Sequence, residues 1–289
     1  MSQETIAFIG TGVMGRSMAT HLLNAGYSVN VFNRTKAKTD DLVAAGATWH
    51  HSPGAAAADA NIIITIVGFP KDVEDVYLGD GGILENAKSG SLIIDMTTSS
   101  PALAKKIATR AAEKGIGALD APVSGGDLGA KEARLSIMVG GEESDFARAL
   151  PAFEIMGKNI QLQGKAGAGQ YTKMCNQIAI ASGMLGITEA MAYAKKSGLD
   201  PFHVLKSIET GAAGSWSLSN LSPRALKGDF APGFYVKHFI KDMRIAIESA
   251  DDMGLELPGL KLAKTLYAKL AAQGGEDEGT QALLKLYLS

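Results

Sequence analysis

An apolar run that leads straight into three spaced glycines constrains the fold of this chain more than any other feature. Residues 5–9 form the run, and Gly10, Gly12 and Gly15 follow it as Gly-x-Gly-x-x-Gly, before a helical pattern over residues 16–25. In a strand–loop–helix unit of this kind, the first glycine makes the tight turn and the second lets a pyrophosphate approach the backbone, while the third lets helix and strand pack closely. The alternative is a glycine-rich turn without a ligand.

Phosphates bound by this loop would lie at the helix N-terminus, because unpaired N–H groups and the helix dipole favour negative charge there. The sequence therefore predicts a dinucleotide-binding unit. The loop residues expected to contact the dinucleotide are Gly10, Thr11, Gly12, Val13, Met14 and Gly15.

The composition is that of an ordinary globular protein and narrows the classes of partner. The chain has 289 residues, of which 46% are hydrophobic and 20% charged, enough for one large or two ordinary domains. A net charge of −2 with scattered basic residues argues against nucleic acid or an anionic membrane as partner. Cys175 is the only cysteine, so no internal disulfide can form and a reducing compartment is expected. No apolar run approaches the ~18 residues of a membrane span, and the first residues show neither the basic n-region nor the apolar h-region of a signal peptide. We expect a cytoplasmic protein.

Short Ile- and Val-rich segments alternate with helical patterns through the first half of the chain. This alternation predicts βαβ units and a parallel sheet that is covered by helices on both faces. The expected strands are residues 6–10, 29–33, 62–67, 92–96, 118–122, 136–139 and 160–163, with helices such as 36–45 and 102–114 between them.

After residue 164 the pattern becomes helical throughout. A proline-free run over residues 170–197 predicts one long helix, and the later helices are expected to break at 211–214, at 222–233, at Pro258 and at Gly274-Gly275. The predicted fold is α/β. A Rossmann-type, doubly wound domain over residues 1–164 is joined by the long helix to an all-α domain over residues 165–289, which would serve substrate binding and oligomerisation.

The end of the second strand predicts which cofactor is bound. An acidic residue about 20 positions past the glycines binds the ribose 2′-OH of NAD in this type of fold, but here the strand ends in Asn33-Arg34-Thr35. Arg34 can pair with a 2′-phosphate and Thr35 can donate a hydrogen bond to it. We therefore expect a preference for NADP, with NAD possible. The alternative is that Arg34 is a solvated turn residue and either cofactor is accepted.

Several separated segments resemble the β-hydroxyacid dehydrogenases, the family of 3-hydroxyisobutyrate dehydrogenase and tartronate semialdehyde reductase. The resemblance covers nearly the whole chain, in order and at suitable spacing. Its segments are the glycine loop at residues 8–15, Asp-x-Thr-Thr at 95–98, Asp-Ala-Pro-Val-Ser-Gly-Gly at 120–126, Gly-x-Gly-Gln-x-x-Lys-x-x-Asn at 167–176, and Phe234 with Lys-Asp-Met at 241–243.

The resemblance implies hydride transfer between nicotinamide and a small β-hydroxyacid or its semialdehyde, such as 3-hydroxyisobutyrate, tartronate semialdehyde or succinic semialdehyde. Lys173 would then be the general acid/base, with its pKa lowered by the helix N-terminus and by partial burial. Asn176 and Gln177 share its helical face and would orient the lysine or hold a substrate hydroxyl, although a structural role for each amide stays open. Gln177 stands where the family usually has asparagine.

Further site residues follow from the same resemblance. The substrate carboxylate would be held by the Ser124-Gly125-Gly126 turn, with Phe234 lining the substrate pocket. The cofactor would be contacted by Val67 and Gly68 past one strand end and by Thr98 past another. Lys241 would reach from the helical domain toward the substrate carboxylate or the nicotinamide ribose.

Two other functions remain open from the sequence. One is decarboxylating oxidation as in 6-phosphogluconate dehydrogenase, for which the chain is short, and the other is a catalytically silent NADP-binding module, which would be expected to lack Lys173. Imine reduction is disfavoured because that lysine is present. The five histidines and one cysteine form no metal-ligand pattern, so no metal is expected. Long apolar faces in the helical half predict a homodimer or homotetramer.

Overall fold

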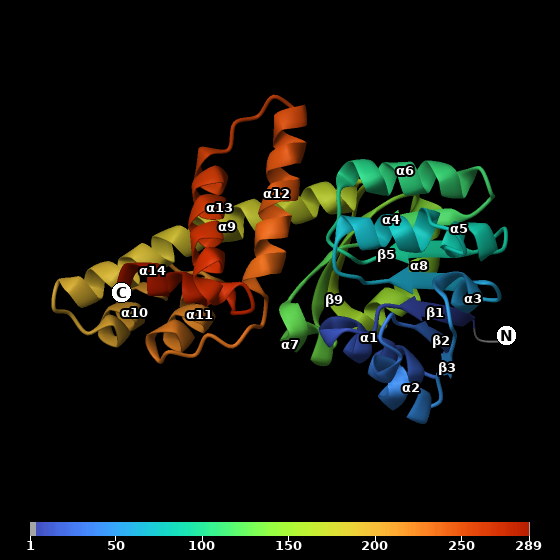
Figure 1. The fold of residues 1–289 in the computed structure, drawn as a ribbon, viewed down its shortest axis with the longest axis horizontal. Coiled ribbons are helices and arrows are strands. Elements are labelled where there is room, and N and C mark those ends of the chain that lie inside the picture. The colour runs from blue at the N-terminus through green and yellow to red at the C-terminus, as the bar shows by residue number, and fades with distance from the viewer. Residues whose placement is uncertain (1–3, 289) are drawn as a thin grey trace. The chain divides into compact units, whose positions relative to one another are not determined.

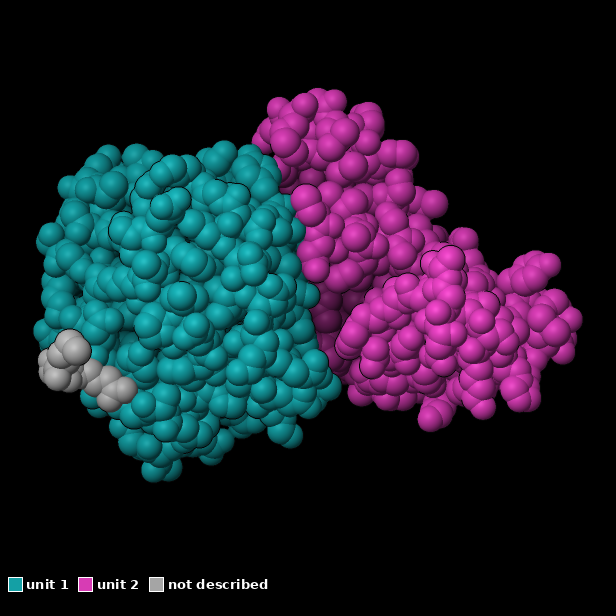
Figure 2. Space-filling view, turned by 180° about the vertical axis from the view of Figure 1, so that it is seen from behind, with its two compact units in different colours: residues 1–173 teal, residues 174–289 magenta. Residues whose placement is uncertain are grey.

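The computed structural model describes residues 4–288 and divides the chain into two compact units, residues 1–173 and 174–289 (Figure 2). The long helix α9 (Ala168–Lys196) contains the boundary between them. The domain boundary expected after residue 164 coincides with the end of strand β9 (Gly157–Gly164) and stays a prediction. Within residues 4–288, no helix combines the length and apolar character needed to cross a bilayer.

Unit 1 alternates strands and helices, as the Ile- and Val-rich segments predict (Figure 1). Its other strands are β1 (Thr5–Ile9), β2 (Ser28–Phe32), β3 (Thr48–Trp49), β4 (Ile62–Thr65), β5 (Leu92–Asp95), β6 (Gly117–Asp120), β7 (Val123–Ser124) and β8 (Leu135–Gly140). Its helices before α9 are α1 (Val13–Asn24), the 3₁₀ turn η1 (Lys36–Thr39), α2 (Asp40–Ala44), α3 (Pro53–Ala57), α4 (Pro70–Leu78), α5 (Ile83–Asn86), α6 (Pro101–Ala112), α7 (Gly126–Lys131) and α8 (Glu143–Met156).

The strands form one sheet in the order β3-β2-β1-β4-β5-β6-β8-β7, with β9 paired to β8. The first six positions reproduce the order of a doubly wound dinucleotide-binding sheet, in which the chain reverses direction between β1 and β4. These strands pair in parallel, as expected. The far end is mixed, however, because β8 is antiparallel to both β6 and β7. The expected parallel sheet is confirmed from β3 to β6, and β8 departs from it at this end.

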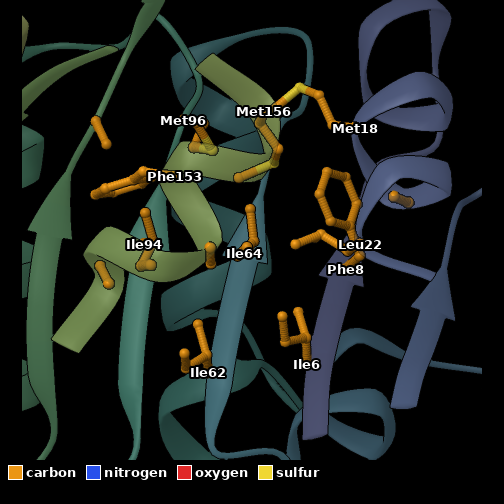
Figure 3. Packing of buried hydrophobic residues seen from close by; sticks show 14 of the residues in the cluster. Ile6, Phe8, Met18, Leu22, Ile62, Ile64, Ile94, Met96, Phe153 and Met156 are labelled. Atoms are coloured by element: carbon orange, nitrogen blue, oxygen red, sulfur yellow. The ribbon is translucent and has the colours of Figure 1, made fainter. Parts of the chain in front are cut away.

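Alternate residues of the central strands point into two separate cores. Ile6, Phe8 and Ile64 face the cluster that Met18 of α1 and Phe153 of α8 complete (Figure 3). Their neighbours along the strands face the opposite side, where α3, α4, α5 and α6 pack; the strand residues on that side are Ala7, Ile9, Ile63 and Ile93. Since side chains alternate with a period of two along a strand, both faces of the sheet are buried. Near-continuous apolar strands are the sequence signature of this arrangement.

Three local expectations are corrected in unit 1. Helix α1 begins at Val13 rather than Arg16, directly after the loop residue Gly12. The single helix expected over 36–45 is a 3₁₀ turn followed by a short α-helix, with the buried Thr39 donating its hydroxyl to the Lys36 carbonyl at the junction. The strands β3 and β7 were not expected, because two residues are too few to show an alternating pattern.

Unit 2 consists of helices around their own core. Its elements after α9 are α10 (Pro201–Ile208), α11 (Trp216–Leu226), α12 (Val236–Asp252), α13 (Pro258–Leu270), the π-type turn η2 (Ala271–Gly275), the 3₁₀ turn η3 (Thr280–Leu284) and α14 (Lys285–Leu288). Phe239 and Tyr267 pack edge to face at its centre, with ring centroids 5.1 Å apart. The break expected over 222–233 is confirmed but begins later, after Leu226, because α11 continues through Pro223 to bury Ser222 and Ala225 on the same face as Leu218. That packing offsets the hydrogen bond that proline removes.

Candidate active site

The three glycines of the loop after β1 have different surroundings. Gly10 has a φ of +99°, and a Cβ there would lie 2.1 Å from the Ile66 carbonyl oxygen. A Cβ on Gly15 would lie 1.9 Å from the Gly10 carbonyl oxygen, so this position lets α1 pack against the loop. Gly12 differs, since a Cβ there would have no neighbour within 4 Å. The space over Gly12 is therefore available to a ligand.

Gly12 is also the N-cap of α1, and its first turn receives no side-chain cap and contains no acidic residue. The first N–H groups of a helix have no partner within the helix and favour an anion. An open glycine face beside these donors fits the phosphates of a dinucleotide. The residues expected to bind them all lie in this loop and first turn: Gly10, Thr11, Gly12, Val13, Met14 and Gly15.

The end of β2 is fastened to the glycine loop. Asn33 accepts a hydrogen bond from the Thr11 N–H at 3.1 Å, and the Thr11 hydroxyl donates to the Lys38 carbonyl at 3.0 Å. Arg34 and Thr35 follow Asn33 and are exposed. The residues expected to recognise the adenine ribose are thus held beside the residues expected to bind the phosphates.

Arg34 has a partner that the sequence reasoning missed. Its Nη1 lies 2.8 Å from Oδ1 of Asp72, which belongs to the first turn of α4. The contact depends on the order of strands in the sheet, because α4 follows β4, and β4 is the neighbour of β1 on the side opposite β2. The carboxylate that the end of β2 lacks is therefore supplied by the first turn of α4.

The loops after β4 and β5 are also bonded to each other. The Val67 N–H donates to the Thr97 hydroxyl at 3.0 Å. Asp95, at the end of β5, accepts from the Thr65 hydroxyl at 2.8 Å and from the Thr97 N–H at 3.0 Å. Gly68 and Thr98 are half-buried beside these residues in the chain. Val67, Gly68 and Thr98, which are expected to contact the cofactor, thus lie in loops that these hydrogen bonds hold in place.

The start of α9 is held by two buried side chains that were not predicted as site residues. Asp120, at the end of β6, accepts hydrogen bonds from the Gly167 N–H at 2.6 Å and from the Gln170 N–H at 2.8 Å. The Gln170 amide accepts from the Ser99 N–H at 2.9 Å and donates to the Thr97 carbonyl at 2.7 Å. These four bonds attach the helix to the ends of β5 and β6. The Gly-x-Gly-Gln segment at residues 167–170 is the sequence feature from which this attachment could have been predicted.

Burial dominates the electrostatics of this anchor. It raises the pKa of Asp120 to about 7, an effect reduced by the bonds from Gly167 and Gln170 and reinforced by the nearby Asp95. Lys173 lies one turn further along α9 than Gln170, and only 7% of its surface is exposed. The candidate acid/base is thus a buried lysine on a helix whose first turn is tied to the sheet.

The loop expected to hold the substrate carboxylate follows β6. Ser124 ends β7, and Gly125 and Gly126 have φ values of +129° and +64°. Only glycine adopts the first of these readily, which explains the glycine pair at this turn. Ser124 and Gly126 are half-buried and Gly125 is exposed.

Four predicted site residues lie in unit 2, and three of them join one hydrogen-bonded chain. Asn176 donates its amide to the Gln177 carbonyl oxygen at 2.7 Å, and Gln177 donates to Oδ2 of Asp242 at 2.6 Å. The Lys241 Nζ lies 3.0 Å from Oδ1 of Asp242, in an ion pair with both side chains buried. Phe234 is half-buried and packs against Phe239, with ring centroids 5.7 Å apart. Gln177 is therefore engaged at both ends of its amide.

The sheet order, the glycine loop and the open helix N-terminus together define a dinucleotide-binding protein of the doubly wound class. Comparison with known proteins extends this result. Residues 5–164 match the family model described as the NAD binding domain of 6-phosphogluconate dehydrogenase. Residues 167–287 match the family model described as "NAD-binding of NADP-dependent 3-hydroxyisobutyrate dehydrogenase". The chain belongs to the β-hydroxyacid dehydrogenase family.

Individual relatives cover essentially the whole chain. The uncharacterized oxidoreductase YkwC of Bacillus subtilis is 63% identical over 286 residues, 99% of each chain. The 2-hydroxy-3-oxopropionate reductase of Escherichia coli is 38% identical, covering 97% of this chain and 96% of its own. The structure of Mycobacterium tuberculosis 3-hydroxyisobutyrate dehydrogenase, solved with L-serine, superposes with a TM-score of 0.92 at 33% identity, covering 99% of this chain and all of that one. An NAD(P)-dependent β-hydroxyacid dehydrogenase activity follows from these relatives as a class.

Proposed function

We propose that this protein is an NADP(H)-preferring reductase of a short semialdehyde, or in reverse a dehydrogenase of the matching β-hydroxyacid, with Lys173 as general acid/base. The observation that carries the proposal is the buried position of Lys173 on a helix bonded directly to the loop that contains Thr98. A group that transfers a proton must be held in position relative to the reacting atoms. Gln170 and Asp120 provide that support.

The nicotinamide, when bound, supplies or accepts the hydride. In the reductive direction the Lys173 ammonium group donates a proton to the carbonyl oxygen of the substrate as that carbon gains the hydride. In the oxidative direction the neutral amine accepts the hydroxyl proton. Lys173 thus passes between its charged and neutral forms once in each turnover.

The substrate class is a small carboxylate. A turn of consecutive glycines exposes N–H groups that can bind an anion, and the Ser124 hydroxyl adds a donor. The E. coli relative is named for 2-hydroxy-3-oxopropionate, and the M. tuberculosis relative for 3-hydroxyisobutyrate, which supports a three- or four-carbon substrate. The roles expected for Asn176, Gln177, Phe234 and Lys241 toward substrate and cofactor stay predictions.

The preference for NADP rests on Arg34 and Thr35. Both are exposed beyond the end of β2, where a guanidinium group and a hydroxyl suit a 2′-phosphate. The description of the family model over residues 167–287, which names an NADP-dependent enzyme, agrees with this assignment.

The test is NADPH oxidation with a panel of small semialdehydes, including tartronate, succinic and methylmalonate semialdehyde. We expect turnover with at least one member, and a loss of kcat of about 10²–10⁴-fold in Lys173→Ala, because the variant lacks a proton donor. Unchanged NADPH affinity and thermal midpoint would show that the variant is folded. Activity that survives the substitution would remove Lys173 from its role, and no turnover with any member would favour a silent binding module. Oxidation of 6-phosphogluconate with release of CO₂ would favour the decarboxylating alternative.

A further inference from the structure

The Arg34–Asp72 ion pair lies across the point of the sheet where dinucleotides bind. Arg34 follows β2 and Asp72 follows β4, and these two strands are the neighbours of β1 on either side. A bond between the two loops must therefore pass over the carboxyl end of β1, which leads into the glycine loop. This is the topological switch point of a doubly wound sheet, where the crevice for the ligand opens.

The two partners differ in their freedom to move. The Asp72 side chain is 17% exposed, and its Oδ2 accepts a hydrogen bond from the Phe69 N–H at 3.0 Å. The same oxygen lies against the backbone of Gly68, where an added Cβ would be 3.0 Å away. The Arg34 side chain is 80% exposed. Asp72 is thus fixed at the start of α4, while Arg34 can leave the pair and turn toward another anion.

We infer that Asp72 determines how strongly the enzyme discriminates between NADP and NAD. A 2′-phosphate must compete with the fixed Asp72 carboxylate for Arg34, and it also meets that negative charge directly. NAD carries a 2′-hydroxyl at the same position, which does not compete for a cation and can donate to a carboxylate. Asp72 therefore lowers the affinity for NADP while sparing NAD. This inference rests on the proposed role of Arg34.

Asp72→Asn provides the test, because the asparagine keeps an oxygen that can accept from the Phe69 N–H but carries no charge. The probes are adenosine 2′,5′-bisphosphate and AMP, with dissociation constants measured by titration calorimetry, so the result does not depend on turnover. We expect about 3- to 10-fold tighter binding of the bisphosphate and no gain for AMP. The gain should shrink at high salt, since exposed charges are screened. Weaker bisphosphate binding, or equal gains for both probes, would overturn the inference.

The matched control is Asp75→Asn on the same helix. Asp75 is exposed and pairs with Lys71 at 2.7 Å rather than with Arg34, so the same change in net charge should leave the ratio of the two affinities unchanged. An equal shift in this variant would show a general charge effect and contradict a specific role for Asp72.

Arg34→Asp and Arg34→Ala separate this inference from the function on which it rests. If Arg34 binds the 2′-phosphate, both variants weaken binding of the bisphosphate selectively. In the Arg34→Ala background, Asp72→Asn should then give a smaller gain, because only the direct repulsion between Asp72 and the phosphate remains to be removed. Equal loss for both probes in the Arg34 variants would instead reject the NADP assignment. A selective loss in the Arg34 variants combined with no effect of Asp72→Asn would leave the NADP assignment standing and reject the role of Asp72.

Discussion

Gln177 uses both ends of its side-chain amide. Its nitrogen donates to the buried Asp242 at 2.6 Å, and its oxygen accepts from Asn176 at 2.7 Å. Both Gln177 and Asp242 are at most 2% exposed. The Gln177 amide is therefore committed to holding the carboxylate that pairs with Lys241. This leaves Asn176 as the amide of the two with its carbonyl oxygen available.

Shortening Gln177 tests this role. We expect Gln177→Asn to lower the free energy of unfolding by about 1–3 kcal/mol, because the buried Asp242 carboxylate loses a donor that the shorter amide cannot supply. Urea unfolding measures the change. The exposed Gln273, also in unit 2, provides a matched control, and Gln273→Asn should stay within about 0.5 kcal/mol of the parent. A Gln177 variant as stable as its control would show that the bond to Asp242 contributes little.

At the scale of elements, the glycine loop and the start of α9 both lie at the carboxyl ends of parallel strands, but they differ in how their N–H groups are satisfied. The loop packs its first and third glycines against backbone and leaves the second open. The helix start is closed by the Asp120 carboxylate and the Gln170 amide. The unpaired N–H groups of an uncapped helix N-terminus can bind an anion. At the start of α9 such groups are bonded to Asp120, which fixes the helix turn that precedes Lys173.

Two alanine substitutions separate packing from ligand binding in the loop. Gly15→Ala should destabilise the protein by at least about 1–3 kcal/mol, because its Cβ would overlap the Gly10 carbonyl. Gly12→Ala has open space and a φ of −73°, so its thermal midpoint should change little while NADPH affinity falls. Thermal unfolding and fluorescence titration measure the two effects. Normal NADPH binding by Gly12→Ala would exclude this glycine from the phosphate site.

The Asp120 anchor predicts a pH dependence of stability. Because burial raises its pKa to about 7 from an ordinary 3.8, the folded protein keeps a proton between these values that the unfolded chain has lost. This contribution to stability is complete below pH 4 and disappears as the pH rises through about 7. Between pH 5 and 6.5, the wild type should therefore lose up to about 1.4 kcal/mol per pH unit relative to Asp120→Asn.

Urea unfolding across that range measures this difference, with the exposed Asp80→Asn as the control of the same chemistry. Parallel pH profiles for wild type and Asp120→Asn would contradict a raised pKa. Wild type and variant must be compared because burial lowers the pKa values of His50 and His238. These histidines make the stability rise with pH, and they do so equally in wild type and in Asp120→Asn.

At the scale of the whole molecule, the helical unit keeps large apolar side chains in contact with solvent. Tyr193 is 76% exposed, Trp216 65%, Leu199 56% and Leu262 54%. Large apolar side chains that gather on the surface of a folded unit mark an interface with another protein. We propose that the helical unit joins copies of this chain into a homodimer or homotetramer.

Light scattering tests the assembly. We expect a mass of two or four times the 30.1 kDa chain at micromolar concentration, and a smaller assembly for Tyr193→Lys. Leu128→Lys, which changes a 48% exposed residue of unit 1, should leave the mass unchanged. A monomeric wild type would end this proposal.

Much of the fold could be predicted because its signals are local. A run of Ile and Val residues, a glycine required by close backbone approach, and a proline at the first position of a helix, as in α3, α4 and α6, each depend on neighbours in the sequence. The dinucleotide fold, the helical second half and the family were therefore accessible without coordinates. The strands of two residues and the antiparallel end of the sheet were not, since they depend on pairing partners alone.

The amino-acid sequence by itself determined the doubly wound sheet, the glycine loop and the lysine of the long helix, because each is written in the spacing of adjacent residues. Only the tertiary structure decided how these residues are supported. Arg34 meets Asp72 across 38 positions, Asp120 holds Gly167 across 47, and Gln177 reaches Asp242 across 65. Such pairs join different strands, loops and helices, and no periodicity along the chain records which of them will meet.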